Sequence, residues 1–174
     1  MCGRFYLDDE SLAMEFWKKR ILEVRPNFPL SEMAVKEIFP TQNCLVLTGQ
    51  QSWHPALMKW GYPKWQGSGT IINARSETVR TSKLFQKEII SNRIVVVSSG
   101  YFEWDQTRQR HYFTGSDAIQ YMAGIYHCFE KETSFVILTK EASADRCAIH
   151  DRMPLLLTKE MLQIWQSDDY EQLL

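Results

Sequence analysis

The sequence has little excess charge of either sign. It has 20 Lys and Arg residues against 21 Asp and Glu residues, so the formal net charge is −1 at pH 7. If such a chain binds nucleic acid, the positive charge must be local rather than spread over the surface. The chain also lacks an apolar run long enough to span a membrane, and it lacks the start of a signal peptide. We therefore expect a cytoplasmic protein with no membrane partner.

Cysteine is also scarce and widely spaced. The chain has four cysteines, at Cys2, Cys44, Cys128 and Cys147, and none of them forms a CxxC pair. This spacing argues against a zinc site and against a disulfide framework, so we expect no metal. Cys44, Cys128 and Cys147 are expected to be small buried hydrophobic residues.

The chain has no repeat, low-complexity tract or evident linker, and its length suits one domain, residues 1–174. Apolar patterns predict helices at 11–24, 77–91 and 158–167, and strands at 44–49, 93–99, 120–127, 133–139 and 153–157. The proline-rich stretch 25–40 is expected to be an extended, loop-like crossing. Because strands outnumber helices and do not alternate with them, we expect an α+β fold. Its sheet should be mostly antiparallel and barrel-like, with helices at the edges.

Side-chain positions in these helices are also predicted. In the first helix, Leu12, Phe16, Ile21 and Val24 share one face, with Asp9 or Ser11 as the N-cap. In the second helix, the residues expected to point inward are Leu84, Phe85 and Ile89. Thr158 is the expected cap of the third helix.

Cys2 directly follows the initiator methionine. Methionine aminopeptidases remove Met1 when the next residue is small, which would leave an α-amine and a thiol on adjacent carbons. An aldehyde condenses with such an amine to a Schiff base, and the thiol then closes a five-membered thiazolidine in a step favoured by proximity. The same pair also suits an N-terminal nucleophile, with the amine as base. On the Met-Cys pair alone, an unreactive cysteine in a buried N-terminal strand remains the favoured interpretation.

Three further segments place polar residues between apolar runs: INARSE (72–77), SGYFEW (99–104) and HDRMP (150–154). Each one alone has an ordinary explanation, such as a turn cap, a surface ion pair or a solvated carboxylate at a strand end. Considered with the MCGRF start, they form a specific set. The chain resembles the SRAP family, named for SOS response-associated peptidase. The resemblance runs nearly end to end and also includes KWGYPKW, AGIY and FVILTKEA, in family order.

The resemblance implies a barrel-like α+β fold with a positive groove for single-stranded DNA. It implies covalent capture of abasic sites, in which an N-terminal Cys2 forms a thiazolidine with the ring-opened aldehyde. No metal or organic cofactor is expected. A monomer suffices for this chemistry, weak abasic-site lyase activity is a secondary expectation, and in a bacterial cell the protein would associate with the nucleoid.

Each matched residue suits a role in this chemistry. Cys2 is the nucleophile, Asn73 orients the amine or the sugar, and Glu103 transfers protons, a task that favours a raised pKa. His150 shuttles a proton or holds a phosphate. The candidate DNA contacts are Arg4, Arg75, Arg152 and the stacking residue Trp65. Glu77 is expected to be a structural partner of an arginine.

Two other hypotheses remain open. One is an N-terminal-nucleophile cysteine hydrolase or peptidase, including self-processing, because glutamine amidotransferase domains also begin Met-Cys-Gly. Those domains usually continue with an apolar residue where this chain has Arg4, and their glutamine-binding motifs are not found here. The other is a non-catalytic single-strand binding module, which would not explain Cys2, Glu103 or His150.

Overall fold

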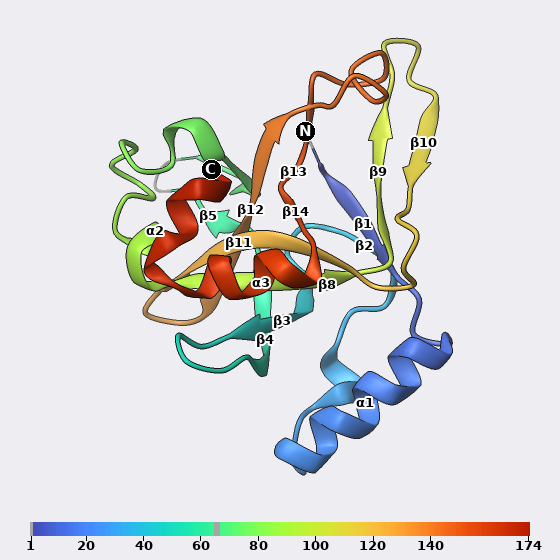
Figure 1. Cartoon of the computed structure of the whole chain (residues 1–174), viewed down its shortest axis with the longest axis vertical. Coiled ribbons are helices and arrows are strands. Elements are labelled where there is room, and N and C mark those ends of the chain that lie inside the picture. The colour runs from blue at the N-terminus through green and yellow to red at the C-terminus, as the bar shows by residue number, and fades with distance from the viewer. Residues whose placement is uncertain (1, 65–66) are drawn as a thin grey trace.

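A closed barrel of five strands forms the centre of the computed structural model, which describes residues 2–64 and 67–174 (Figure 1). Its strands are β3 (Asn43–Thr48), β4 (His54–Trp60), β8 (Arg93–Ser98), β11 (Gln120–Cys128) and β12 (Thr133–Glu141). They pair in the order β12–β4–β3–β8–β11 and back to β12. Only β4 and β12 are parallel. The predicted α+β fold with a mostly antiparallel, barrel-like sheet is confirmed.

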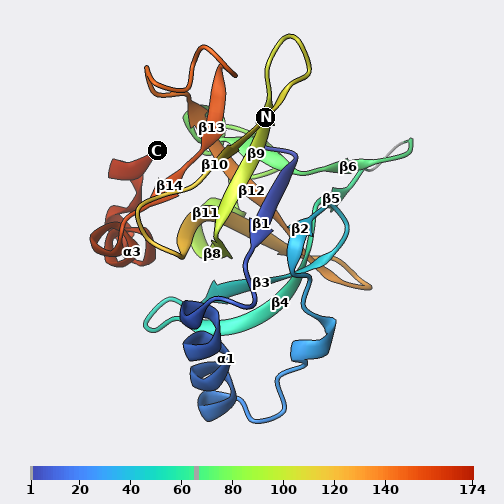
Figure 2. The ribbon, with the colours of Figure 1, turned by 90° about the vertical axis from the view of Figure 1, so that its right-hand side faces the viewer.

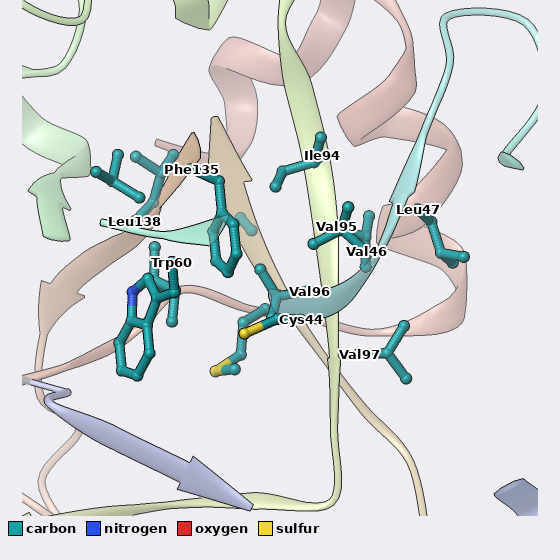
Figure 3. Packing of buried hydrophobic residues seen from close by; sticks show 14 of the residues in the cluster. Cys44, Val46, Leu47, Trp60, Ile94, Val95, Val96, Val97, Phe135 and Leu138 are labelled. Atoms are coloured by element: carbon teal, nitrogen blue, oxygen red, sulfur yellow. The ribbon is translucent and has the colours of Figure 1, made fainter. Parts of the chain in front are cut away.

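The barrel is filled by aliphatic and aromatic side chains (Figure 3). Val46, Val96 and Phe135 come from three different strands and are completely buried. Trp60 is also buried, and its indole N–H donates to the Ile72 carbonyl at 3.0 Å. Burial of this apolar area provides the main driving force for folding.

A second, four-stranded sheet stands beside the barrel. Its antiparallel order is β10 (Arg110–Phe113), β9 (Gly100–Trp104), β1 (Arg4–Leu7) and β2 (Lys36–Ile38). Only Ser99 separates β8 from β9, so the chain passes from the barrel into this sheet at one corner (Figure 1). The Ser99 N–H donates to the Tyr6 carbonyl at 2.7 Å, and its hydroxyl accepts the Asp8 N–H at 3.0 Å. The corner therefore fixes β1 against the barrel.

Short strands extend the barrel sheet. β7 (Asn73–Arg75) runs parallel to β12, β13 (Arg152–Pro154) pairs with the C-terminal end of β12, and β14 (Leu156–Leu157) pairs with β11. β5 (Tyr62–Pro63) pairs with β6 (Thr70–Ile71). The 3₁₀ helices are η1 (Leu30–Glu32), η2 (Ser76–Thr78) and η3 (Asp168–Leu173). β7 and β13 lie on the rim of the barrel next to β1, where they contribute to the site.

The helices lie at the edges, as expected. α1 (Leu12–Val24) has the predicted residue Ser11 as its N-cap, and the Ser11 hydroxyl accepts the Met14 N–H. α3 (Lys159–Gln166) begins at the predicted cap Thr158. α2 (Glu88–Ser91) has a single turn. None of the helices within the described residues is long and apolar enough to cross a membrane.

The predicted apolar face of α1 is correct only at Ile21. Leu12 is 84 % exposed, and Phe16 and Val24 are each 65 % exposed, whereas Met14 and Ile21 are buried. The helix projects from the body of the protein (Figure 1), and its side chains that pack on the core are those of Ala13, Met14, Trp17 and Ile21. These residues form a narrow stripe along the helix, so the apolar residues beside it stay in solvent.

Three other expectations are also corrected. The helix predicted over 77–91 is reduced to η2, a series of turns and α2, and Leu84 is exposed while Phe85 and Ile89 are buried. Thr81 donates to the Thr78 carbonyl, a local bond that competes with helix formation. The stretch 25–40 contains β2 as well as loop. Cys44 is buried as expected, but Cys128 at a strand end and Cys147 in a loop are exposed.

Candidate active site beside strand β1

Cys2 lies immediately before β1, and its side chain is completely buried. The Asn73 side-chain amide, at the start of β7, donates to the Cys2 carbonyl at 2.9 Å. The Cys2 thiol lies 3.7 Å from the Arg4 carbonyl. Burial and the nearby charge of Glu103 raise the pKa of the Cys2 thiol. The sulfur is therefore a neutral thiol near pH 7, next to an amide that fixes its backbone.

Glu103 is on β9 and is 3 % exposed. Burial disfavours the charged carboxylate, and the nearby charge of Asp151 adds to this effect, so the pKa of Glu103 rises to about 7. A carboxyl group with this pKa gives up and accepts protons readily at neutral pH. β9 pairs with β1, and Arg146 of the loop before β13 donates to Tyr101 of β9, so β9 meets both the N-terminal strand and that loop.

His150 is on that loop, between β12 and β13, and is partly buried. Its Nδ1 lies 3.0 Å from the Arg152 backbone N–H and 2.9 Å from an Asp151 carboxylate oxygen. Burial lowers the pKa of His150. With the ring neutral, the contact with Asp151 is not an ion pair. Burial thus favours an uncharged imidazole on this loop.

Tyr101 and Arg146 are two further residues at this site that sequence reasoning did not identify. Tyr101 precedes Glu103 by two positions, shares its face of β9, and is buried. Arg146 donates to the Tyr101 hydroxyl at 2.6 Å, and burial raises the pKa of Tyr101 to about 12. Because Arg146 and His150 are on the same loop, this bond fastens the His150 loop to the strand that carries Glu103. Tyr101 belongs to the SGYFEW segment, but the sequence has no signal that pairs it with Arg146.

Arg152 and Glu77 form an ion pair at the edge of the site. Arg152 is 8 % exposed and donates to both Glu77 carboxylate oxygens, at 2.6 and 2.9 Å, and to the Thr139 carbonyl at 2.6 Å. Hydrogen bonding from Arg152 lowers the pKa of Glu77. Glu77 is thus the structural partner of an arginine. With so little of its surface exposed, Arg152 presents almost no guanidinium to a DNA phosphate.

The other candidate DNA contacts have different positions. Arg75 ends β7 and is exposed, two residues from Asn73. Arg4 is on β1 and donates to Glu37 at 3.0 Å. The predicted stacking residue Trp65 lies outside the described residues. In the described part of the chain, no three His, Cys, Asp or Glu side chains are grouped so as to hold a metal ion.

The comparison with protein families identifies the group to which this site belongs. A family model described as SOS response associated peptidase (SRAP) matches residues 1–173. The chain belongs to the SRAP family. The family assignment made from the MCGRF, INARSE, SGYFEW and HDRMP segments is therefore confirmed.

Individual SRAP relatives agree with this assignment. The abasic site processing protein YedK of Escherichia coli is 27 % identical over 182 residues, which cover 97 % of this chain and 81 % of YedK. The abasic site processing protein YoaM of Bacillus subtilis is 26 % identical, over 95 % of this chain and 78 % of YoaM. A crystal structure of a protein from Bacteroides thetaiotaomicron has the same fold, with a TM-score of 0.76 and 22 % identity. That match covers 99 % of this chain and 86 % of the other.

Proposed function

We propose that this SRAP protein captures abasic sites in single-stranded DNA through a covalent bond to Cys2. The observation that carries the proposal is the placement of Cys2, the second residue of the chain, against Asn73 and near the buried carboxyl of Glu103. Relatives that match over nearly the whole chain are named abasic site processing proteins. The product is a protein–DNA crosslink that shields the lesion from nucleases.

The chemistry begins once Met1 is removed and the Cys2 nitrogen is a free amine. An abasic deoxyribose in its open form has an aldehyde at C1′. The amine attacks this carbon and the carbonyl oxygen leaves as water, which gives a Schiff base. The thiol sulfur then adds to the same carbon while its proton passes to the nitrogen, and a thiazolidine ring closes. The net reaction joins protein and DNA with the loss of one water.

Glu103 is the proton-transfer group in this scheme. Its protonated form donates to the ring oxygen of the sugar as the ring opens and to the hydroxyl that leaves as water. Its carboxylate form accepts a proton from the amine. A pKa of about 7 makes both forms available at neutral pH. Asn73 holds the Cys2 backbone in position for the attack, and His150 relays protons as a neutral imidazole.

The hydrolase hypothesis is less well supported by the site. A cysteine hydrolase needs a thiolate, which a positive neighbour favours, whereas burial and the negative charge of Glu103 raise the pKa of the Cys2 thiol. Thiazolidine closure tolerates a neutral thiol because the sulfur attacks an activated imine within the same molecule. Self-processing and weak lyase activity through the Schiff base are secondary activities in this proposal.

The direct test uses untagged protein and a single-stranded oligonucleotide with one abasic site. After heating in detergent, a denaturing gel should show a shifted band. Its mass should equal the protein without Met1 plus the DNA minus one water. Cys2→Ala and an N-terminal extension should each abolish this band. Cys147→Ala, at an exposed cysteine, is the matched control and should retain it. If protein with a confirmed free N-terminal cysteine gives no adduct, the proposal is wrong.

A further inference from the structure

The four-stranded sheet has one face packed against the barrel and one face turned outward. β-strand alternation places Phe5, Tyr101 and Glu103 on the inner face, where all three are buried. The outer face consists of the alternate residues of β1, β9 and β10. We call these residues the outer aromatic face: Arg4, Tyr6, Phe102, Trp104, Arg110 and Tyr112. In Figure 2, β9, β1 and β2 lie at the front of the molecule, with α1 below them.

Guanidinium groups and aromatic rings are in contact across the outer aromatic face. The Arg4 guanidinium is 5.1 Å from the Trp104 ring centroid, and the Arg110 guanidinium is 4.7 Å from the Phe102 ring centroid. The Tyr112 ring stacks on Phe102 with centroids 4.8 Å apart. These contacts hold the side chains in fixed orientations. The face is still open to solvent at Tyr112, which is 45 % exposed.

Gly100 provides the space in which Tyr112 lies. A Cβ atom at Gly100 would be 2.7 Å from a ring carbon of Tyr112 and 2.6 Å from the Phe113 carbonyl. No side chain fits there, so the tyrosine ring can approach the backbone of β9 closely. An exposed ring held in this way has little conformational entropy to lose when a ligand stacks on it.

The charges on this face complement a phosphate backbone. Arg4 and Arg110 both donate to one oxygen of Glu37, at 3.0 and 3.1 Å, so two positive groups share a single carboxylate. Glu37 occupies the type of position that a phosphate oxygen would take between two guanidiniums. Surfaces that bind single strands usually combine aromatic rings, which stack on the bases, with guanidinium groups, which pair with the phosphates.

The outer aromatic face is continuous with the Cys2 site. Arg4 is two residues from Cys2 on the same chain segment, and it pairs across the sheet with Phe102, next to Glu103. A DNA strand whose abasic sugar reaches Cys2 can therefore place its neighbouring nucleotide over Arg4. From there the face extends across β9 to Arg110 and Tyr112 on the edge strand β10.

We propose that Arg110 and Tyr112 on the outer aromatic face bind the unpaired nucleotides on one side of the abasic site. Tyr112 stacks on a base, and Arg110 leaves Glu37 to pair with a phosphate. This inference rests on the proposed function, because it assumes that the lesion is at Cys2. It adds a direction to the binding, since the nucleotides on only one side of the lesion meet this face.

The test measures affinity for single strands with a tetrahydrofuran abasic analogue at the 5′ end, the centre or the 3′ end. The analogue has no aldehyde, so binding stays non-covalent and fluorescence anisotropy gives a dissociation constant. Wild-type protein should bind one end-substituted strand more tightly than the other. Tyr112→Leu, which keeps apolar packing on Gly100 and Phe102, should weaken binding of that strand by about tenfold and remove the preference.

Arg110→Gln provides a second variant that leaves the apolar packing in place, since its side chain is 51 % exposed. It should weaken binding of the same strand and lower the salt slope of its affinity by about 1. Arg20→Gln, at an exposed arginine of α1 paired with Glu23, is the control and should match the wild type. Equal losses on both end-substituted strands, or no loss in either variant, would overturn the proposal. Failure of the wild-type protein to crosslink a true abasic site would instead overturn the thiazolidine chemistry.

Discussion

Glu103 and Trp104 are adjacent in β9 and face opposite sides of the same sheet. Glu103 is 3 % exposed on the inner face, and burial raises its pKa to about 7. Trp104 lies on the outer face, where the Arg4 guanidinium covers its ring. Within one strand, alternation thus gives one residue a low-dielectric environment and the next a hydrated, positively charged one.

The difference between the two faces separates the chemistry of the proposed site from its DNA binding. Groups on the inner face, such as Glu103 and Tyr101, have pKa values shifted by burial, so chemistry there should depend on pH. The charged groups on the outer face, Arg4 and Arg110, are partly solvated, so binding there should depend on salt. A variant on the inner face should therefore change the pH dependence and leave the salt dependence as in the wild type. A variant on the outer face should do the reverse.

The largest effect is expected from Glu103→Gln, which keeps the shape of the side chain but removes its proton transfer. The crosslinking rate at saturating DNA should fall by about 10²-fold or more. In the wild type, the protonated form of Glu103 declines above pH 7, so the rate should fall on the alkaline side. The variant should lose this alkaline decline and retain a rise as the Cys2 α-ammonium group loses its proton near pH ~8. An unchanged pH–rate profile would remove Glu103 from the mechanism.

The same substitution has a signature in stability. The pKa of Glu103 is raised in the folded state, so the group stabilises the fold fully below about pH 4.5. This contribution is lost as the pH rises through about 7. The free energy of unfolding of the wild type should therefore decline over that interval by more than that of Glu103→Gln. Urea unfolding at several pH values measures this difference, and parallel curves would contradict the shifted pKa.

Arg152→Met is expected to affect folding rather than DNA affinity. It leaves Glu77 and the Thr139 carbonyl without their guanidinium partner. Loss of one member of a buried pair costs about 3–5 kcal/mol, but the partly exposed Glu77 regains water, so we expect about 2–4 kcal/mol. Chemical denaturation measures the change, and the salt slope of DNA binding should stay as in the wild type. A lower salt slope with unchanged stability would restore Arg152 as a DNA contact.

Arg146→Met and Tyr101→Phe should produce similar, smaller effects. Both remove the 2.6 Å bond that joins the His150 loop to β9, and methionine retains apolar contact with the Phe113 ring. We expect the crosslinking rate at saturating DNA to fall by about tenfold, since a released loop misplaces His150. The double variant should be no slower than either single one, because the same bond is lost. Additive losses, or a changed melting temperature with an unchanged rate, would contradict this positioning role.

Much of the fold was predictable because its central strands are long and apolar. The runs that form β8 and β12 are buried on both faces and contain consecutive β-branched residues, which indicate strands from local sequence alone. β2 was not predictable, since three residues with two charged side chains resemble a loop. The helix expected over 77–91 failed because Val79, Phe85 and Ile89 are buried from a series of turns rather than from one helical face.

The site was predictable where its residues come from recognisable segments. Asn73 and Glu103 were identified in this way, and they lie near Cys2 as expected of residues that share one site. Contacts between distant loops were not predictable. The pairing of Arg146 with Tyr101 and the sharing of Glu37 by Arg4 and Arg110 depend on how separate strands are assembled.

Glu37→Gln tests the outer face with the smallest expected change. Glu37 holds Arg4 and Arg110 in place, but it also competes with a phosphate for them. Removing its charge should strengthen single-strand binding by about three- to tenfold at low salt, because one repulsive charge near the backbone is lost. The gain should shrink as salt rises, since this face is solvated. Glu23→Gln, on α1, is the matched control in the same anisotropy measurement. Weaker binding by Glu37→Gln would show instead that the carboxylate serves mainly to orient the two arginines. The same principle would then hold for both sites, with a partly buried amide fixing Cys2 and a partly exposed carboxylate fixing Arg4.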